Sequence, residues 1–467
     1  MINKYKQRIS THLLTPIQLF MRQEKSSGIV LGLSVLVALI LANSPWRESY
    51  FHILEQSFGF AIGGNTYLNF SLEHWINDGL MSLFFFVVGL ELKREFLSGE
   101  LRDLRKVVIP IGAAIFGMVV PSLIYLLFNA GTPVAQGWGI PMATDIAFAL
   151  AVVYMLGNRV PLPVKVFLTT LAIVDDIGSV LVIAFFYTSE ISFLNLAIGF
   201  GFLACMYGAN RLGVKNIWFY AIVAIVGVWG SFLMSGIHAT IAAVLAAFMI
   251  PAHSRVSESS FIKRVRQKID HFEQIEGNEF STLEHEQVEI ISEVRRTATM
   301  AVPLLQRFEH ALHPFVSFVI MPIFALANAG VAFVDMNMAD VFSNGVALGV
   351  MLGLLLGKPI GIMLSVFLLQ RLRVGSLSPT LTWRRLAGVG FLASIGFTMS
   401  MFVTTLAFSD PVNHVQAKVG IFAASILGII IGYSLLRSCP IDAQAAEQNN
   451  EDDDDESDEF SDFDAYI

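Results

Sequence analysis

Charged residues and cysteines are both scarce in this sequence. Only 15% of the 467 residues are Asp, Glu, Lys or Arg, whereas soluble globular proteins carry about 25%. Together with 55% hydrophobic residues and a mean hydropathy of +0.64, this excludes an ordinary soluble domain and indicates an integral membrane protein. The two cysteines, Cys205 and Cys439, lie far apart in the sequence. We therefore expect neither a disulfide framework nor a thiolate metal site.

Basic residues are missing from the C-terminal end. Residues 440–467 hold 12 of the 38 acidic residues and no Lys or Arg, so the rest of the chain, with 30 basic and 26 acidic residues, has a net charge of +4. The segment 438–467 is predicted to be a disordered acidic cytoplasmic tail, because it is highly charged and poor in apolar residues. The N-terminal segment 1–26 is basic, and the apolar stretch after it lacks a small-residue cleavage site. We expect a retained first helix and not a signal peptide.

Long apolar runs predict an all-α polytopic membrane protein with about twelve transmembrane helices. Turn residues and charges separate the runs, and the approximate limits follow from them. The predicted spans are 27–43, 76–92, 106–129, 138–157, 161–187, 192–209, 214–233, 236–251, 312–333, 342–370, 385–408 and 416–436.

The distribution of Lys and Arg predicts the orientation of these spans. With a cytoplasmic N-terminus, 27 of the 30 Lys and Arg residues fall in segments on the cytoplasmic side. Because cytoplasmic loops are enriched in positive charge, both termini are predicted to be cytoplasmic. The transmembrane domain then covers 27–437, with a periplasmic loop at 44–75 and a long cytoplasmic loop at 252–311.

Two connecting segments carry local structure signals. Residues 60–70 contain a Gly-Gly-Asn turn followed by strand-forming residues, which fits either a small periplasmic hairpin or an irregular loop. The loop 252–311 has apolar residues at helical spacing among charged ones, which predicts two short amphipathic helices at the cytoplasmic face.

Four charged residues fall deep inside predicted spans: Asp145, Asp175, Asp176 and Lys358. The aspartate pair lies near the middle of the span 161–187, and neither flank is long enough to cross a bilayer alone. Each charge at mid-membrane costs about 3 kcal/mol, so the four oppose insertion by on the order of 12 kcal/mol. An ion or proton site is the favoured interpretation, and a structural pair satisfied by neighbouring helices is the alternative.

Lys358 is expected to be the only buried cation available, so pairing with it would relieve the cost of one acid. Neighbouring residues on a helix project about 100° apart, so Asp175 and Asp176 cannot both face one point. One of them is expected to pair with Lys358 while the other lines a polar cavity. Two aspartates and one lysine also allow the site to change charge by proton exchange.

The backbone is expected to be interrupted in the fourth and eleventh spans. Gly137, Gly139 and Pro141 precede the segment 142–145, and the run GVGFLASIGFTMS, which contains Gly396, lies in the eleventh span. Unwound backbone is tolerated in a membrane where it lines a cavity or is buried in protein. Interrupted spans at corresponding positions of two halves point to a midplane site between inverted repeats, here spans 3–5 and 10–12. Close helix packing by glycine is the alternative explanation.

Seven segments of the sequence, in order, resemble the NhaA family of bacterial sodium/proton antiporters, and the resemblance covers roughly residues 15–437. Inverted repeats and two broken, crossing helices are properties of that family, so the resemblance implies them here as well. The segments are WINDGLMSLFFFVVGLELKREFLSGELR (75–102), IPMATDIAFAL (140–150), LAIVDDIGSV (171–180), SGIHATIAAV (235–244), HPFVSFVIMPIFALANAGV (313–331), GKPIGI (357–362) and IGFTMSMF (395–402).

The resemblance implies roles for individual residues. Asp176 would be the main cation ligand and proton acceptor, and Asp175 would take part in the site and pair with Lys358. Thr144 and Asp145 would lie where the broken helices cross. There, Asp145 would offset the positive helix ends and Lys358 the negative ones.

The resemblance also implies a set of residues that respond to pH. A surface ion-pair cluster at the membrane boundary, or a packing role for the histidine, would explain the same residues without any such response. The set comprises Glu91, Arg94, Glu95, Glu309, His310, His238 and Asp78.

The function implied by the resemblance is electrogenic exchange of sodium or lithium ions for protons, which serves pH and sodium homeostasis. We expect a multi-pass protein of the bacterial inner membrane, a homodimer in the lipid bilayer, with no enzymatic activity, no cofactor and no nucleic-acid partner. A sodium-coupled organic-solute carrier is the first alternative, although no core arginine would hold an anionic solute. An intramembrane aspartyl protease is the second, although neither Asp145 nor Asp176 lies in a GxGD sequence.

Overall fold

The computed structural model describes residues 24–62, 65–99, 104–188, 191–254, 256–275, 282–333, 341, 345–375 and 378–440. The predicted acidic tail therefore lies outside the described residues, apart from its first three positions. The chain divides into two compact units. The first comprises Met1–Phe84, Glu95–Glu190 and Pro314–Ile467, and the second comprises Phe85–Arg94 and Ile191–His313.

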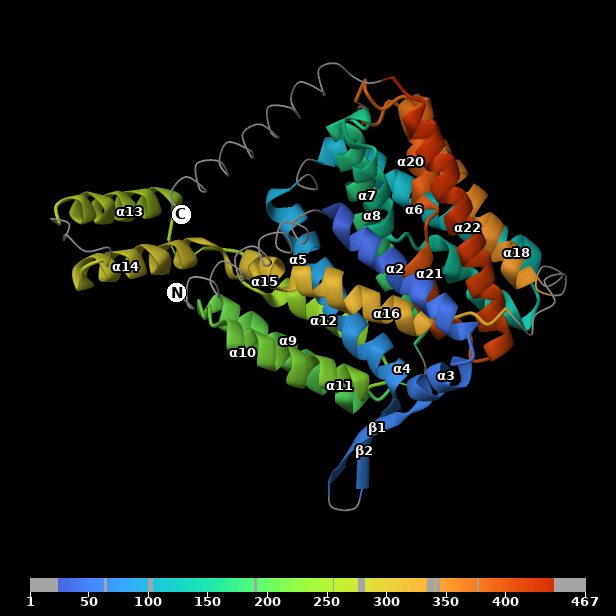
Figure 1. The fold of residues 1–467 in the computed structure, drawn as a ribbon, viewed down its shortest axis with the longest axis horizontal. Coiled ribbons are helices and arrows are strands. Elements are labelled where there is room, and N and C mark those ends of the chain that lie inside the picture. The colour runs from blue at the N-terminus through green and yellow to red at the C-terminus, as the bar shows by residue number, and fades with distance from the viewer. Residues whose placement is uncertain are drawn as a thin grey trace, which may run out of the picture. The chain divides into compact units, whose positions relative to one another are not determined.

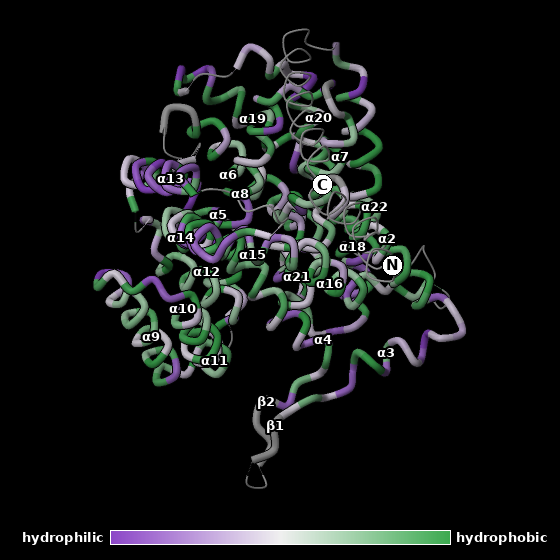
Figure 2. Tube along the Cα trace, turned by 60° about the vertical axis from the view of Figure 1, so that its left-hand side comes forward, coloured by the Kyte–Doolittle hydropathy of each residue, from purple (hydrophilic) through white to green (hydrophobic). Residues whose placement is uncertain are grey.

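The described residues form a helical membrane protein, as predicted. Eight helices are long and apolar enough to cross a membrane, and two bent helix pairs raise the number to ten. Two shorter apolar helices, Ile217–Leu233 and Ala239–Met249, coincide with the predicted spans 214–233 and 236–251. Each of the twelve predicted spans therefore overlaps an apolar helix or a bent pair. Figure 2 shows how apolar residues dominate these helices.

The first unit contains most of the predicted spans (Figure 1). Spans 3–5 form one set of three helices in this unit, and spans 10–12 form another. In each set a broken span lies between two continuous ones, as the sequence predicted. The inverted relation of the two sets stays a prediction. The elements are α2 (Glu24–Ala42), α3 (Arg47–Glu55), β1 (Ser57–Ile62), β2 (Asn65–Ser71), α4 (Leu72–His74), the start of α5 (Met81–Ser98), α6 (Leu104–Asn129), α7 (Ile146–Met155), α8 (Leu162–Phe186), α16 (Met321–Asn328), α18 (Gly345–Leu352), α19 (Lys358–Arg371), α20 (Trp383–Ala393), α21 (Phe397–Ala407) and α22 (Pro411–Arg437).

Glycines bring the tenth span close to α6. They recur every fourth residue where α18 continues through a π-helical turn into α19, and their missing side chains let the two backbones approach. A Cβ on Gly353 would lie 3.0 Å from the carbonyl oxygen of Pro121, and one on Gly357 would lie 2.7 Å from the Cα of Pro121. A Cβ on Gly361 would overlap the carbonyl group of Phe116. These glycines of the tenth span thus serve close helix packing.

Both predicted interruptions are present. In the fourth span, a 3₁₀ helix (Pro133–Met142) gives way to extended backbone before α7 begins at Ile146. In the eleventh, α20 and α21 are separated by residues 394–396 and bent by 46°. The fifth span, α8, is one continuous helix of 25 residues with the aspartate pair at its middle.

The predicted periplasmic loop 44–75 contains more structure than expected. β1 and β2 pair antiparallel in a two-stranded sheet, as in the hairpin alternative, while the periplasmic location of the segment stays a prediction. Sequence analysis missed α3, which is bent by 111° from α2. The buried Tyr50 anchors α3, because its hydroxyl donates a hydrogen bond to the carbonyl of Leu326 at 2.6 Å.

The second unit is built around an apolar core between short helices. The part of α5 that belongs to this unit contributes Phe86 and Leu90 to the core. Gly89 of α5 packs closely on α12 (Ala239–Met249), because a Cβ on Gly89 would lie 2.8 Å from the Cβ of Ala247. The remaining elements are α9 (Phe193–Arg211), α10 (Ile217–Ile222), α11 (Gly230–Leu233), α12 (Ala239–Met249), α13 (Glu258–Glu273), α14 (His285–Ala301) and α15 (Leu304–Phe315).

The two amphipathic helices predicted in the loop 252–311 are α13 and α14, which lie side by side (Figure 1). Hydrophilic residues are frequent in both helices (Figure 2). Ion pairs join them: Lys268 pairs with Glu293, and His271 Nε2 lies 3.4 Å from Glu286 Oε1.

Candidate functional site

The centre of the first unit holds an ion pair between α8 and α19. Lys358 Nζ contacts Asp175 Oδ2, and both side chains are fully buried. Thr144, in the interruption of the fourth span, lies between the two charges. Its Oγ1 accepts a hydrogen bond from Lys358 Nζ at 2.7 Å and lies 2.6 Å from Asp175 Oδ2. Three segments far apart in the sequence thus meet at one polar cluster, and the pair is the one that the family resemblance implies for Asp175 and Lys358.

Asp145 caps the first turns of two helices at once. As the N-cap of α7 it accepts a hydrogen bond from the Phe148 amide at 3.2 Å. Its other carboxylate oxygen accepts from the amide of Thr398 at 3.0 Å, at the start of α21, and from the Thr398 hydroxyl. The N-terminus of a helix carries about half a positive charge, so two such ends surround this buried carboxylate. This matches the position that the family resemblance implies for Asp145.

The two interruptions cross and satisfy each other's backbone groups. The Asp145 amide donates to the carbonyl of Ile395 at 2.6 Å, and Thr144 Oγ1 lies 3.0 Å from the carbonyl oxygen of Ala393, the last residue of α20. Ser400 Oγ donates to the carbonyl of Ile140 at 2.9 Å. Because a hydroxyl has one proton, Thr144 donates either to Asp175 or to Ala393 while it accepts from Lys358.

Gly396 stands at the N-terminus of α21 with an ordinary negative φ of −85°. It is needed for space and not for backbone freedom, because a Cβ there would overlap Ser400 Oγ and approach the Leu354 side chain to 3.0 Å. Gly396 lies between the two helices of the bent span, and its part in the site stays a prediction.

The cluster is closed to solvent in this conformation. Asp176, next to Asp175 on α8, is only 2% exposed, and Thr144, Asp145 and Lys358 are at most 1% exposed. The second oxygen of Asp175, Oδ1, accepts no hydrogen bond from the described residues, and the same holds for the hydroxyl of Ser179, one turn beyond the pair. An ion can therefore reach these oxygens only after the helices move.

Lys358 is not the only buried cation, which corrects the sequence analysis. Arg385 and Lys418 are also buried, with exposed fractions of 4% and 9%. Arg385 sits in the first turn of α20 and is satisfied by carbonyl groups, those of Thr380 at 2.7 Å and Pro440 at 2.9 Å. Hydropathy placed both residues near span ends, where burial depends on tertiary packing. Among these three cations, Lys358 is the one that contacts an aspartate of the predicted set.

The predicted pH-response residues are divided between the two units. Within the second unit, Arg94 Nε lies 3.3 Å from Glu309 Oε1, and Glu91 lies on the same helix as Arg94. In that unit, His238 is the N-cap of α12 and His310 is exposed on α15.

The other two pH-response candidates lie in the first unit. Asp78 has its own partner, because its Oδ2 lies 3.0 Å from His74 Nε2. Glu95 lies near the end of α5. The role of the whole set stays a prediction.

Two contributors to these sites were missed from sequence alone. Thr398 gives Asp145 both an amide and a hydroxyl, and its only signal was a threonine just after the Gly396 break. Lys93 donates to the carbonyl groups of Phe248 and Ile250 at the end of α12, where a cation offsets the negative helix end.

Comparison with known proteins agrees with this arrangement. The family described as Na⁺/H⁺ antiporter 1 matches residues 18–436. A protein of Oleidesulfovibrio alaskensis named Na⁺/H⁺ antiporter NhaA is 46% identical over 429 residues, which cover 91% of this chain and 94% of that protein. One of Koribacter versatilis with the same name is 45% identical over 424 residues, 91% of each chain. A match of this length, at this identity, shows that the chain belongs to the Na⁺/H⁺ antiporter 1 family.

Proposed function

We propose that the chain is an electrogenic antiporter that exports Na⁺ or Li⁺ in exchange for H⁺. The observation that carries this proposal is the buried polar cluster at the crossing of two interrupted spans. Interrupted helices at mid-membrane supply free backbone groups for ions, and buried acids supply the charge that a cation or a proton neutralises. Family membership and the names of its relatives support Na⁺ and H⁺ as the exchanged ions.

Burial and the family resemblance favour Asp176 as the exchanging carboxylate. Asp145 is offset by two helix N-termini, and Asp175 forms the direct ion pair with Lys358. Asp176 follows Asp175 on α8, is equally buried, and corresponds to the residue that the resemblance implies as the main cation ligand. We infer that a cation or a proton neutralises Asp176, and that Asp175 joins the site when its contact with Lys358 loosens.

The oxygens around the pair suit a hard monovalent cation. The described residues contain no group of three or more His, Cys, Asp or Glu side chains placed to hold a metal ion. The transported ion would instead be held by the two carboxylates together with hydroxyl and carbonyl oxygens, such as those of Thr144 and Ala393. Such oxygens bind Na⁺ without the soft ligands that transition metals prefer.

Competition for the same oxygens would couple the two ions. A carboxylate that holds a proton cannot also hold Na⁺, so each ion displaces the other when the site opens to one side and then to the other. Asp175, Asp176 and Lys358 can each carry a proton, which allows more than one proton per cation. Net charge would then cross the membrane, and each charge is worth about 2.3 kcal/mol per 100 mV.

The remaining parts of the proposal concern location and assembly. We infer a bacterial inner-membrane protein with both termini in the cytoplasm, since this orientation puts most Lys and Arg inside. We further infer a homodimer joined through the hairpin β1–β2, because both strands of a two-stranded sheet are edges that can pair with another chain.

Sodium-induced collapse of a pH gradient in everted membrane vesicles tests the proposal. The native protein should collapse the gradient with Na⁺ and Li⁺ but not with K⁺. Asp176→Asn should abolish the response and Asp176→Glu should retain part of it, while Asp270→Asn on the exposed face of α13 should behave like the native protein. Robust exchange by Asp176→Asn would refute the role of Asp176. No exchange by the native protein, in vesicles shown to contain it, would favour a sodium-coupled solute carrier.

A further inference from the structure

Several buried hydroxyl groups inside the spanning helices bond the carbonyl one turn earlier. Ser122 donates to the carbonyl of Met118 at 2.8 Å, and Thr404 donates to that of Ser400 at 2.8 Å. Within a membrane, this contact is an ordinary way for a serine or threonine of a helix to satisfy its hydroxyl. A buried hydroxyl that does not make it therefore calls for a separate explanation.

Ser179 of α8 carries such a hydroxyl. Its side chain is 1% exposed, and its Oγ forms no hydrogen bond with the residues that the structure describes. Oδ1 of Asp175, one turn earlier on the same helix, likewise accepts no hydrogen bond from the described residues. Two oxygen-bearing groups on neighbouring turns are thus buried with unused bonding capacity. Burying a polar group without a partner costs free energy, so a ligand that contacts these oxygens would recover that cost.

Helical geometry directs Ser179 between the two aspartates. Successive residues project about 100° apart, so Ser179 lies about 40° from Asp175 and about 60° from Asp176, between their two directions. Side chains of a helix tilt toward its N-terminus, so the Ser179 hydroxyl points back over the turn that carries the pair. Residues three and four positions apart on a helix have Cβ atoms about 5–6 Å apart. The hydroxyl is therefore within reach of an ion that either carboxylate holds.

The hydroxyl of Thr144, which also lies beside the pair, is already engaged. It accepts from Lys358 Nζ at 2.7 Å, and its one proton goes to Asp175 or to the carbonyl of Ala393. The Ser179 hydroxyl makes no such contact with the described residues, so both of its lone pairs are available to a ligand. A hard cation such as Na⁺ binds oxygen lone pairs. Ser179 can thus complete an oxygen shell that Thr144 and the carboxylates begin.

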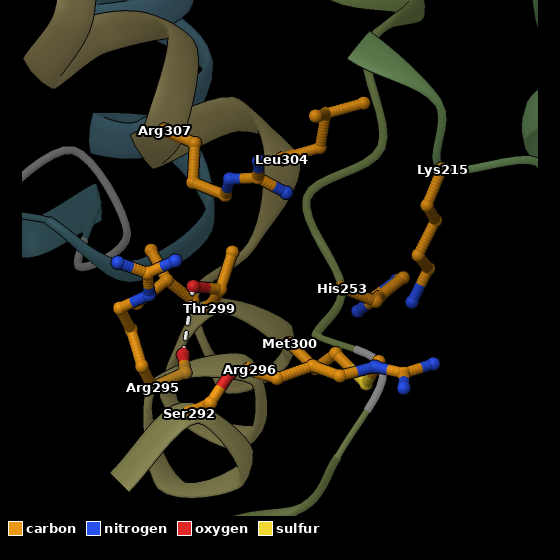
Figure 3. A pocket seen from close by; sticks show the side chains of 10 residues that line it. Lys215, His253, Ser292, Arg295, Arg296, Thr299, Met300, Leu304 and Arg307 are labelled. Carbon is orange, nitrogen blue, oxygen red and sulfur yellow. Dashed lines mark hydrogen bonds between the residues drawn. The ribbon is translucent and has the colours of Figure 1, made fainter. Parts of the chain in front are cut away.

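The second unit contains a cavity of about 440 Å³, but its chemistry does not suit a cation (Figure 3). The Thr299 hydroxyl in it donates to the main-chain carbonyl of Arg295 at 2.9 Å. Ammonium and guanidinium groups repel a metal ion, so this cavity is not a second place for Na⁺. The titratable side chains that line it are all basic ones: Lys215, His253, Arg295, Arg296 and Arg307.

We propose that Ser179 is a ligand of the transported cation and that its hydroxyl raises the affinity of the aspartate site for Na⁺. This inference rests on the proposed function and adds to it a residue that sets cation affinity. A proton on Asp176 needs one carboxylate oxygen, whereas Na⁺ needs several oxygens around it. Loss of the Ser179 hydroxyl therefore weakens the binding of Na⁺ and leaves the carboxylates able to bind protons.

The Na⁺ dependence of gradient collapse in everted vesicles tests this role. In Ser179→Ala, the half-saturating Na⁺ concentration should rise about tenfold, since a hydroxyl contact to an ion contributes on this scale. The rate at saturating Na⁺ should stay within about twofold of the native rate, because only the binding of the ion is weakened. Ser179→Thr keeps a hydroxyl at this position and should bind Na⁺ more tightly than Ser179→Ala.

Ser365→Ala is the matched control. Ser365 is also 1% exposed, and its hydroxyl also has no hydrogen-bond partner among the described residues. It lies between α19 and α6, because a Cβ on Gly112 would lie 2.9 Å from Ser365 Oγ. Removing this hydroxyl should leave the half-saturating Na⁺ concentration unchanged. An equal rise in Ser365→Ala would assign the effect to packing and overturn the proposal.

Stabilisation of the purified protein by Na⁺ against thermal unfolding measures binding without transport. Ser179→Ala should need about tenfold more Na⁺ than the native protein for the same rise in unfolding temperature. Equal Na⁺ dependence of the two proteins would overturn the proposal, even where the variant no longer transports. A native protein that Na⁺ stabilises but that exchanges no protons would instead count against the proposed antiport and leave the role of Ser179 to this measurement.

Discussion

Removing the ammonium group of Lys358 should destabilise the protein more than almost any other single change. Both partners of the Lys358–Asp175 pair are fully buried, so Lys358→Met leaves an aspartate whose main compensation is the Thr144 hydroxyl. Breaking a buried ion pair by removing one partner costs about 3–5 kcal/mol. Lys263→Met, on the exposed face of α13, is the matched control and should change stability by less than about 0.5 kcal/mol.

The double variant Lys358→Met/Asp175→Asn separates pairing from packing. If the cost arises from the uncompensated carboxylate, the second change should recover most of the lost stability, since replacing both charges of a buried pair is often neutral. Thermal unfolding of the purified protein in one detergent gives the comparison across the four corners of the cycle. The reasoning would be refuted if Lys358→Met unfolded at the same temperature as the native protein. It would also be refuted if the double variant lost as much stability as the two single variants together.

Three further outcomes follow from other contacts. Asp145→Ala removes the hydrogen-bond acceptor at the starts of two helices. It should lower the stability measured by thermal unfolding by about 1–4 kcal/mol, because one N-cap contributes about 0.5–2 kcal/mol. A loss of stability no larger than that from one exposed N-cap would contradict the double capping. Gly357→Val should lower the yield of folded protein in gel filtration, since its side chain would meet Pro121, and unchanged yield would show that α6 can shift. Lys268 lowers the pKa of Glu293, so their contact is present at neutral pH and is lost as pH falls through that lowered value. The protection factors of α13 amides against hydrogen exchange should then fall at acid pH in the native protein, but not change further in Glu293→Gln.

The sequence predicted the membrane fold and the interruptions for physical reasons that act locally. A bilayer requires about 20 apolar residues in a row for a spanning helix, and Gly and Pro disfavour a continuous one. Both signals, the apolar run and its interruption by Gly or Pro, come from residues that are neighbours in the sequence, as around Pro141 and Gly396. The helix α3 was missed because its burial depends on Tyr50 reaching Leu326, more than 270 positions later.

The pairing within the site could be predicted only in part. Helical geometry shows that Asp175 and Asp176 face different directions, but it does not say which one faces α19. That choice depends on how α8 is rotated in the bundle, and the family resemblance supplied it. Thr398 joins Asp145 from 253 positions away, and no periodicity reports such a contact.

The interruptions and the charged cluster depend on each other. A helix that stops inside a membrane exposes amides and carbonyls, and each unsatisfied group costs several kcal/mol. Here the Asp145 carboxylate satisfies amides of α7 and α21, and the Asp145 amide satisfies the carbonyl of Ile395. Thr144 connects the carbonyl end of α20 to Lys358 and Asp175. Any movement that opens the broken spans must therefore alter the partners of the charged residues. By the same contacts, exchange of a proton for a cation at the carboxylates must change the balance between closed and open arrangements, which is the coupling that an antiporter needs.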